Sequence, residues 1–281
     1  MFCESTGRRS VLCVPGDDPR MIEKALASGA DEVVIDFEDA VAADRKVRAR
    51  ESLGAVAWPD DLPRVAVRIN APRTPWSHGD VIAVAESGAP IGTLVLPKAE
   101  SRADVGFVER LLDGLGASGV GIQALVETAA GLTGLADLTS ARERLTSLII
   151  GYADLAASLG RPSASDWRWA QETLLAHGRA AGLELVDGPW LGVQVDDAFT
   201  AAVTAAASIG FDAKWVIHPR QVAIVNALMA PAAADVERAR QVLAAITDAQ
   251  ASGVGAIRLG SELVDEAMAV AARRVLAKAS R

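Results

Sequence analysis

Short apolar runs rich in β-branched residues alternate with longer stretches of helical period along most of this 281-residue chain. Eight such runs are expected to form strands, at residues 10–16, 32–38, 64–70, 93–98, 121–127, 147–154, 183–189 and 213–219. A segment whose apolar residues recur at helical spacing follows each run. Eight strand–helix units predict an α/β fold, the (β/α)8 TIM barrel. The alternative is a doubly wound sheet, which usually has fewer strands and a Gly-rich first turn that this sequence lacks.

The chain continues beyond the last strand–helix unit, and this suggests two parts. We expect the barrel to span residues 1–230 and a C-terminal extension to span residues 231–281. The extension is expected to contain a helix, a loop over residues 251–265 and a last helix. It could simply pack on the barrel, or it could act as a lid over the barrel rim or over the rim of a neighbouring subunit.

Most of the expected strands are apolar through their length and then end in polar side chains. The carboxyl ends of all strands in such a barrel meet at one face, where these barrels hold their active sites. The ionisable or amide residues at these ends are Asp36, Glu38, Asp39, Arg68, Asn70, Lys98, Glu127, Asp154, Asp187 and His218. The sequence therefore predicts a functional site at this rim.

Arg68 at the end of the third run needs charge partners, because an unpaired buried guanidinium is costly. The acids of the neighbouring second run are the obvious partners, and strand alternation places Asp36 and Glu38 on the same side of that strand. The pair could be a structural ion pair. It could also hold an arginine that stabilises an oxyanion.

Glu127 and Asp154 follow the fifth and sixth runs, which are neighbours in the expected barrel. Two adjacent carboxylates repel each other unless a cation lies between them, and oxygen ligands favour Mg²⁺ or Mn²⁺. Alternatively, one of the two caps the following helix. The chain has three histidines, and their spacing does not suggest a zinc site.

Composition and charge exclude several other classes of protein. The net charge is −8 and the basic residues form no block, so nucleic acid is not expected as a partner. The two cysteines, Cys3 and Cys13, predict no disulfide framework, which favours a reducing, cytoplasmic location. No signal peptide or membrane-spanning run is expected. Gly114, Gly116 and Gly119 match G-x-G-x-x-G, but they follow an expected helix and therefore predict a helix end and turn.

Taken together, six segments of the chain resemble a known family. They are RSVLCVPGDDPRMIEKALASGADEVVIDFEDAV, VRIN, LVLPKAES, ALVETAAG, GYADL and GFDAKWVIHPRQV. They resemble, in the same order, the citrate lyase β-subunit-like family, the CoA-ester lyases within the HpcH/HpaI-type aldolases that include malyl-CoA and citramalyl-CoA lyases. The resemblance covers roughly residues 8–230 and implies a TIM barrel with Mg²⁺ at its rim.

The resemblance also implies roles for individual residues. By motif, Glu127 and Asp154 look like the metal ligands. Arg68 looks like the residue that binds the substrate enolate, and Glu38 and Asp39 look like the acids that orient it. Asp36 lies deeper in the second run and, from that position, could be only structural.

Further roles are implied at the edges of the site. Arg9, Lys98, His218 and Pro219 are the residues that the resemblance suggests for binding CoA. In the family, a VDxP-like motif of the C-terminal segment sends an aspartate into the next subunit as an acid/base. In this chain the corresponding sequence is ELVDEAM, in which Asp265 matches the aspartate but the proline is missing.

The function implied is Claisen-type cleavage, or the reverse condensation, of a 3-hydroxyacyl-CoA such as malyl-, citramalyl- or citryl-CoA. The products would be acetyl-CoA or another acyl-CoA and a 2-oxo acid, with Mg²⁺, or Mn²⁺ in its place, as cofactor and CoA as part of the substrate. The same site could instead serve a class II aldolase acting on free 2-oxo acids, an acyl-CoA thioesterase or a non-catalytic CoA-binding subunit. The resemblance also implies a homo-oligomer, a trimer or hexamer.

Overall fold

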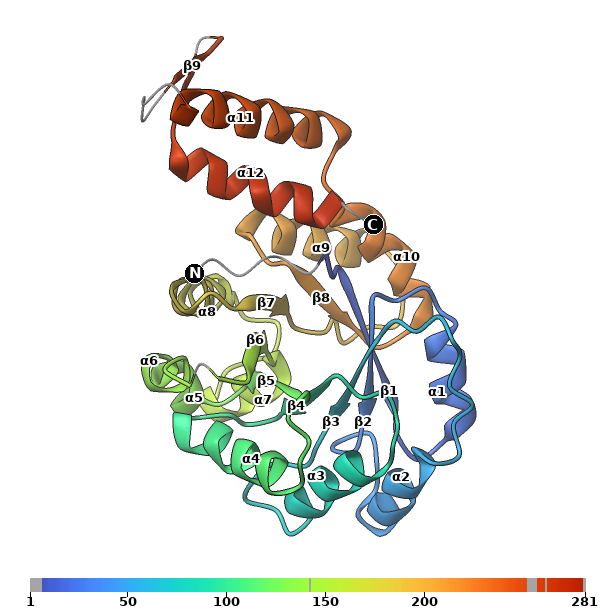
Figure 1. Ribbon diagram of the computed structural model, residues 1–281. Helices are drawn as coiled ribbons and strands as arrows, with labels where there is room; N and C mark the ends of the chain where they lie inside the picture. Colours follow the sequence, from blue (N-terminus) through green and yellow to red (C-terminus); the bar gives the residue numbers. More distant parts are fainter. Residues whose placement is uncertain (1–6, 142, 252–256, 261, 280–281) are drawn as a thin grey trace.

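Eight parallel strands close into a barrel in the computed structural model, which describes residues 7–141, 143–251, 257–260 and 262–279 (Figure 1). The strands are β1 (Ser10–Pro15), β2 (Glu32–Asp36), β3 (Arg64–Arg68), β4 (Thr93–Leu96), β5 (Gly121–Val126), β6 (Leu145–Ile150), β7 (Glu184–Asp187) and β8 (Ala213–Val216). They pair in chain order, and β8 closes the barrel against β1, with Ser10 opposite Lys214. The predicted TIM barrel is confirmed.

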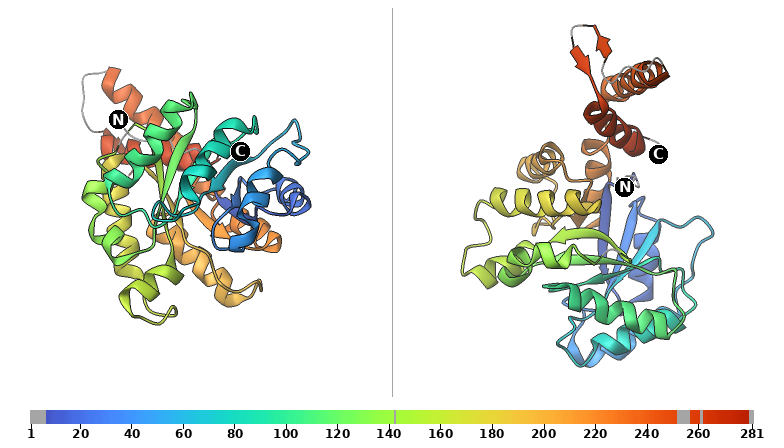
Figure 2. Two further views of the ribbon diagram at one scale, coloured as in Figure 1. Left: turned by 90° about the horizontal axis from the view of Figure 1, so that it is seen from below. Right: turned by 60° about the vertical axis from the view of Figure 1, so that its left-hand side comes forward.

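Helices surround the barrel and cover the outer face of its strands (Figures 1 and 2). They are α1 (Pro19–Leu26), η1 (Ala43–Arg45), α2 (Lys46–Ser52), α3 (Ser77–Glu86), α4 (Arg102–Gly114), α5 (Ala129–Thr133), α6 (Leu135–Leu138), α7 (Tyr152–Leu159), α8 (Arg168–Ala181), α9 (Asp197–Ile209) and α10 (Pro219–Leu228). Asp18 caps α1 through the Arg20 amide, and the predicted turn after α4 contains Gly116 with a φ of 71°. No described helix is long and apolar enough to cross a membrane.

Two apolar cores explain why the strands are continuous apolar runs. Inside the barrel lies a small cluster to which every strand contributes: Val11, Val34, Ala66, Val95, Leu125, Ile149, Val186, Ala213 and Trp215. Val33 and Ile35 of β2 point the other way, into the larger core between strands and helices. Because side chains alternate along a strand and both faces are buried, both sets of positions must be apolar.

Several strands are shorter than the sequence predicted, and the difference changes the position of one candidate residue. The sixth run was expected over residues 147–154, but β6 spans Leu145–Ile150, and the chain leaves the sheet at Gly151. Asp154 therefore lies in the first turn of α7 and not on a strand. The apolar run alone could not locate this end, because the first turn of α7 is itself partly buried.

The segment after α10 forms an arm that projects away from the barrel (Figures 1 and 2). It consists of α11 (Ala233–Ala251), the two-stranded hairpin β9 (Ile257–Leu259) and β10 (Glu262–Val264), and α12 (Glu266–Ala279). The expectation of a loop over 251–265 is wrong for the residues of β9 and β10, whereas residues 252–256 and 261 lie outside the described part. The arm has its own apolar cluster, which includes Val242, Ile246 and Val264.

The arm is attached at the amino end of the barrel. The Lys278 ammonium in α12 donates to the carbonyl of Phe211, which precedes β8, at 2.9 Å. The strand ends that were expected to form the functional site lie at the opposite end of the barrel. The arm is therefore not a lid over the rim of its own chain.

A buried polar cluster closes the amino end of the barrel. Arg8, which is 2% exposed, contacts the Glu32 carboxylate and donates to Gln123 Oε1 at 2.8 Å. Its Nη2 atom lies 3.1 Å from Glu184 Oε2. Since β2 begins at Glu32 and β7 begins at Glu184, this cluster connects distant parts of the chain.

We expect the substitution Arg8→Met to destabilise the barrel strongly, because it leaves Glu32 and Glu184 buried without this counter-ion. The free energy of unfolding, measured in urea, should fall by about 3–5 kcal/mol. A matched control is Arg168→Met, which removes an exposed pair with Glu172 and should cost less than about 1 kcal/mol. Equal losses in the two variants would contradict this role for Arg8.

Candidate active site

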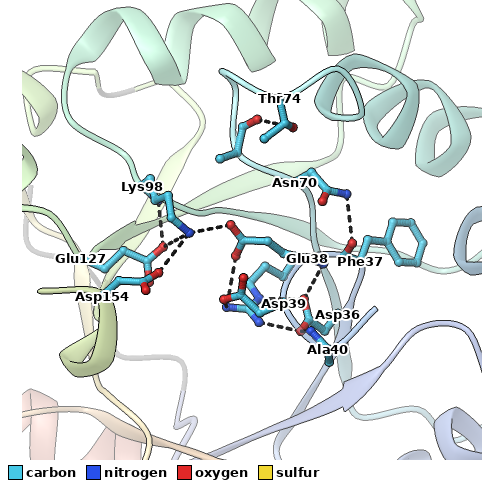
Figure 3. A network of polar contacts seen from close by, with 12 residues as sticks. Asp36, Phe37, Glu38, Asp39, Ala40, Asn70, Thr74, Lys98, Glu127 and Asp154 are labelled. Atoms are coloured by element: carbon cyan, nitrogen blue, oxygen red, sulfur yellow. Dashed lines mark hydrogen bonds and ion pairs between the residues drawn. The ribbon is translucent and has the colours of Figure 1, made fainter. Parts of the chain in front are cut away.

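A bidentate ion pair between neighbouring strands anchors the carboxyl end of the barrel. Asp36 in β2 lies opposite Arg68 in β3. Arg68 Nε donates to Asp36 Oδ1 at 2.7 Å, and Arg68 Nη2 donates to Asp36 Oδ2 at 2.5 Å. The same carboxylate accepts from the amides of Glu38 and Ala40, at 2.8 and 3.0 Å (Figure 3). Asp36 therefore fixes both the guanidinium plane and the turn that follows β2.

Glu38 and Asp39 approach the same guanidinium from the turn after β2. Arg68 Nη1 lies 3.3 Å from Glu38 Oε2 and 3.5 Å from Asp39 Oδ2. The Asp39 side chain is 62% exposed, whereas the Glu38 side chain is 8% exposed. The shortest and best directed contacts to Arg68 come from Asp36, which is consistent with the structural role expected for it. The orienting role expected for Glu38 and Asp39 remains a prediction.

Lys98, two residues after β4, points its ammonium into a group of three carboxylates (Figure 3). Its Nζ atom lies 2.8 Å from Glu38 Oε1, 3.0 Å from Asp154 Oδ2 and 3.7 Å from Glu127 Oε1. Although burial lowers the pKa of Lys98, the hydrogen bond to Glu38 and the charge of Glu127 raise it above its usual value. The structure thus places Lys98 at the expected metal ligands, and its predicted contact with CoA is untested.

Glu127 follows β5 and is held in a tightly packed position. Its Oε1 atom accepts from the Lys98 amide at 3.0 Å. Gly151 leaves the space for the other oxygen, because a Cβ at that position would lie 2.5 Å from Glu127 Oε2. Burial, with repulsion from Glu38, raises the pKa of Glu127 to about 8. A carboxylate held in this way is stabilised by any cation that binds beside it.

Asp154 lies beside Glu127, where the helix dipole of α7 favours a carboxylate. Gly151 is the N-cap of α7 and no side chain caps that helix, so the alternative of a capping role for Asp154 finds no support. No described group of three or more His, Cys, Asp and Glu residues forms a complete metal-binding cluster. Two carboxylates fit Mg²⁺, which keeps several positions for water or substrate. The space left by Gly151 for the Glu127 carboxylate agrees with this fit.

A cavity of about 440 Å³ at the carboxyl end of the barrel is lined by five of these charged residues: Asp36, Asp39, Arg68, Glu127 and Asp154. Its apolar walls include Leu125 from β5 and Trp215 from β8, and the Arg68 guanidinium lies 6.0 Å from the centre of the Trp215 ring. Cys13 from β1 also lines it, and burial raises the pKa of this thiol so that it stays protonated. Trp215 was not predicted as a site residue, although it lies within the eighth expected strand, residues 213–219.

A second buried network supports the chain turn that carries Asp154. The Tyr152 hydroxyl donates to the Asp187 carboxylate and accepts from Gln171 Nε2 at 2.6 Å. Lys214, inside β8, donates to Asp187 Oδ2 at 2.5 Å and to the Gly188 carbonyl at 2.6 Å. Asp187 was noted in the sequence as a polar strand end, whereas Tyr152 and Lys214 were missed. Their only signal is a polar side chain within an apolar run.

Arg9 does not join the other candidates. It precedes β1 and so lies at the amino end of the barrel, opposite the cavity. Its backbone amide donates to Asp31 Oδ2 at 2.7 Å, and its guanidinium lies 3.3 Å from the same oxygen. The contact with CoA predicted for Arg9 is untested, and its position separates it from the cavity. The sequence could not show at which end of β1 a site residue would lie, because polar residues flank this strand on both sides.

His218 and Pro219 lie at the correct end of the barrel but outside the described cavity lining. Pro219 is the first residue of α10, and His218 Nδ1 caps that helix by accepting from the Arg220 amide at 3.2 Å. Their neighbour Ile217 does line the cavity. The contact with CoA expected for both residues is therefore untested, and a local structural role is visible for each.

Asp265 lies far along the arm, between β10 and α12. Its exposed carboxylate caps α12 through the amides of Ala267 and Met268, at 3.0 and 3.2 Å. None of the described residues that line the cavity comes from the arm. Asp265 could thus reach such a site only on another copy of the chain.

Comparison with known proteins places these features in a family context. A model of the family described as HpcH/HpaI aldolase/citrate lyase matches residues 9–219. An L-malyl-CoA/beta-methylmalyl-CoA lyase of Rhodobacter capsulatus is 33% identical, over 92% of this chain and 90% of that protein. A (3S)-malyl-CoA thioesterase of Cereibacter sphaeroides is 36% identical, over 96% of this chain and 94% of the other.

Solved structures show the same fold. The structure of CitE from Mycobacterium tuberculosis in complex with magnesium, acetoacetate and coenzyme A covers 98% of this chain and 98% of its own. The two chains are 32% identical, with a TM-score of 0.77. RipC from Yersinia pestis is 29% identical, with a TM-score of 0.72 over 83% of this chain and 99% of the other.

The raised pKa of Glu127 predicts a pH dependence of stability in metal-free protein. With a folded-state pKa of about 8 against an ordinary value of 4.5, Glu127 binds its proton more tightly in the folded state. Its contribution to stability is therefore present below pH 4.5 and is lost as the pH rises towards 8. In EDTA, the free energy of unfolding of the wild type, measured in urea, should fall by about one to a few kcal/mol over this pH range. The Glu127→Gln variant should not show this fall. Parallel pH curves for the two proteins would contradict this assignment.

Proposed function

Because the chain belongs to the HpcH/HpaI aldolase/citrate lyase family, we propose that it is a Mg²⁺-dependent lyase of CoA esters. Its substrate would be a 3-hydroxyacyl-CoA such as malyl-, citramalyl- or citryl-CoA, cleaved to an acyl-CoA and a 2-oxo acid. The observation that carries this proposal is the position of Arg68. A guanidinium held by Asp36 shares one cavity with the carboxylates of Glu127 and Asp154.

The residues of the cavity match the charges that develop in this reaction. As the carbon–carbon bond breaks, its electrons pass to the thioester as an enolate, and the hydroxyl proton leaves as the 2-oxo acid forms. Arg68 would stabilise the enolate oxygen, because its guanidinium is fixed in place before the charge appears. Glu127 and Asp154 would hold the metal, which when bound polarises the carbonyl of the 2-oxo acid. A general acid then protonates the enolate carbon, which balances the proton lost from the hydroxyl.

Thioester hydrolysis is the second candidate, because a (3S)-malyl-CoA thioesterase is 36% identical to this chain. The same cavity could hold the same ester while water attacks the thioester carbonyl. The products would then be a free hydroxy acid and CoA, with the carbon–carbon bond intact. Arg68 would stabilise an oxyanion in either reaction, so the site geometry alone does not separate the two.

The test is to incubate the enzyme and Mg²⁺ with malyl-, citramalyl-, citryl- and hydroxymethylglutaryl-CoA and to identify both products. We expect an acyl-CoA and a 2-oxo acid from at least one ester, and a drop in kcat of about 10²–10³ for Arg68→Ala. A matched control is Arg73→Ala, which removes an exposed pair with Glu100 and should leave kcat unchanged. Release of free CoA and hydroxy acid would favour the thioesterase, and no turnover of any ester would contradict both.

Asp265 is proposed as the general acid, acting in the cavity of a neighbouring copy in a homo-oligomer. Its exposed position on an arm that leaves the barrel at the other end supports action on a second copy. The proline that follows in the family motif is replaced here by Ala267, whose backbone amide donates to Asp265 Oδ1 at 3.0 Å.

If Asp265 serves a neighbouring cavity, two inactive variants should complement each other. Asp265→Ala and Arg68→Ala are each expected to be strongly impaired. Mixed oligomers, formed by dissociation and reassociation, should contain some cavities with both residues intact and regain a measurable part of the wild-type kcat. A control mixture of Asp265→Ala with Asp265→Asn should stay inactive. Full activity of Asp265→Ala alone would exclude this role.

A further inference from the structure

Lys98 has a backbone conformation that its residue type rarely adopts. Its φ is 51°, and it is the single non-glycine residue with positive φ among the described residues. This left-handed conformation is unfavourable for a residue with a Cβ, so the surrounding structure must enforce it. It allows the Lys98 amide and the Lys98 ammonium to face the same carboxylate. The amide lies 3.0 Å from Glu127 Oε1, and Nζ lies 3.7 Å from that oxygen.

The ammonium also contacts the two residues proposed to hold the metal. It lies 3.0 Å from Asp154 Oδ2 and 3.7 Å from Glu127 Oε1. Mg²⁺ bonds to carboxylate oxygens at about 2.1 Å, so an ion at these two oxygens would compete with the ammonium for them. The two cations would also repel each other, because little water separates them.

Glu38 offers the ammonium an alternative partner. Nζ lies closest to Glu38 Oε1, at 2.8 Å, and this carboxylate is almost fully buried. The other Glu38 oxygen lies 3.3 Å from Arg68 Nη1, so Glu38 connects the two cations of the site. Lys98 could therefore leave Asp154 and Glu127 while it keeps its contact with Glu38.

We propose that Lys98 is a positioning residue that acts as an exchangeable counter-ion for the metal ligands. Its ammonium holds Glu127 and Asp154 together until a divalent ion takes their oxygens, and it then stays with Glu38 alone. The Lys98 amide keeps Glu127 in place throughout. This inference rests on the proposed metal site. Its consequence is a site that is assembled before the ion arrives, at the cost of weaker binding of the ion.

The test uses the full-length protein, stripped with EDTA and titrated calorimetrically with Mn²⁺ at pH 7.5. Lys98→Met removes the charge and should bind Mn²⁺ about tenfold more tightly than the wild type, because one competing cation is gone. In EDTA, the Tm of Lys98→Met should lie below that of the wild type, since three carboxylates have lost a counter-ion. Saturating Mn²⁺ should restore the Tm.

Two further variants separate charge from backbone strain. Lys98→Gly relieves the left-handed conformation and should also bind Mn²⁺ more tightly, whereas Lys98→Arg keeps the charge and should bind it like the wild type. Equal or weaker Mn²⁺ binding by both Lys98→Met and Lys98→Gly would overturn the inference.

A fourth variant distinguishes failure of this inference from failure of the metal site. Glu127→Gln should lose Mn²⁺ binding. If it binds Mn²⁺ as well as the wild type, or if the wild type binds none, both the metal site and the role of Lys98 are overturned. If the wild type and the Lys98 variants behave as expected but no CoA ester is cleaved, the proposed function fails and the role of Lys98 stands.

Discussion

Charge compensation at the carboxyl end of the barrel is the constraint on which this site depends. The barrel brings acids at the end of β2, after β5 and in the first turn of α7 to one rim, where they would repel each other if unpaired. Two cations prevent this: Arg68, held by Asp36, and Lys98, which joins Glu38 to the remaining pair of carboxylates. The contacts of this network link segments that are far apart in the sequence.

The rest of the barrel makes this concentration of charge tolerable. One apolar layer fills the middle of the barrel, and a polar cluster around Arg8 closes the amino end. Gly151 lets the chain turn closely against Glu127, and Tyr152 ties the same turn to Asp187. The side chains that would touch substrate or metal are thus supported by packing on one side and by hydrogen bonds on the other, as preorganised sites require.

The C-terminal arm places a different demand on the molecule. It carries its own apolar cluster and leaves the barrel at the end opposite the cavity. The cavity of one chain therefore receives no described residue from its own arm. If the arm supplies the general acid, the chemistry depends on association between chains, and the site of a single chain contains the oxyanion and metal groups without the acid.

The sequence by itself determined the barrel and most of the rim, because strand period and polar strand ends are local signals. Arg68 and Glu127 were identified in this way. Only the tertiary structure decided which groups touch. It assigned the main contact with Arg68 to Asp36, placed Lys98 among carboxylates and put Trp215 in the cavity wall. These contacts depend on the lengths and directions of side chains and on the left-handed backbone conformation of Lys98. Both arise from packing between segments that are distant in the sequence, so they leave no periodic signal in the chain.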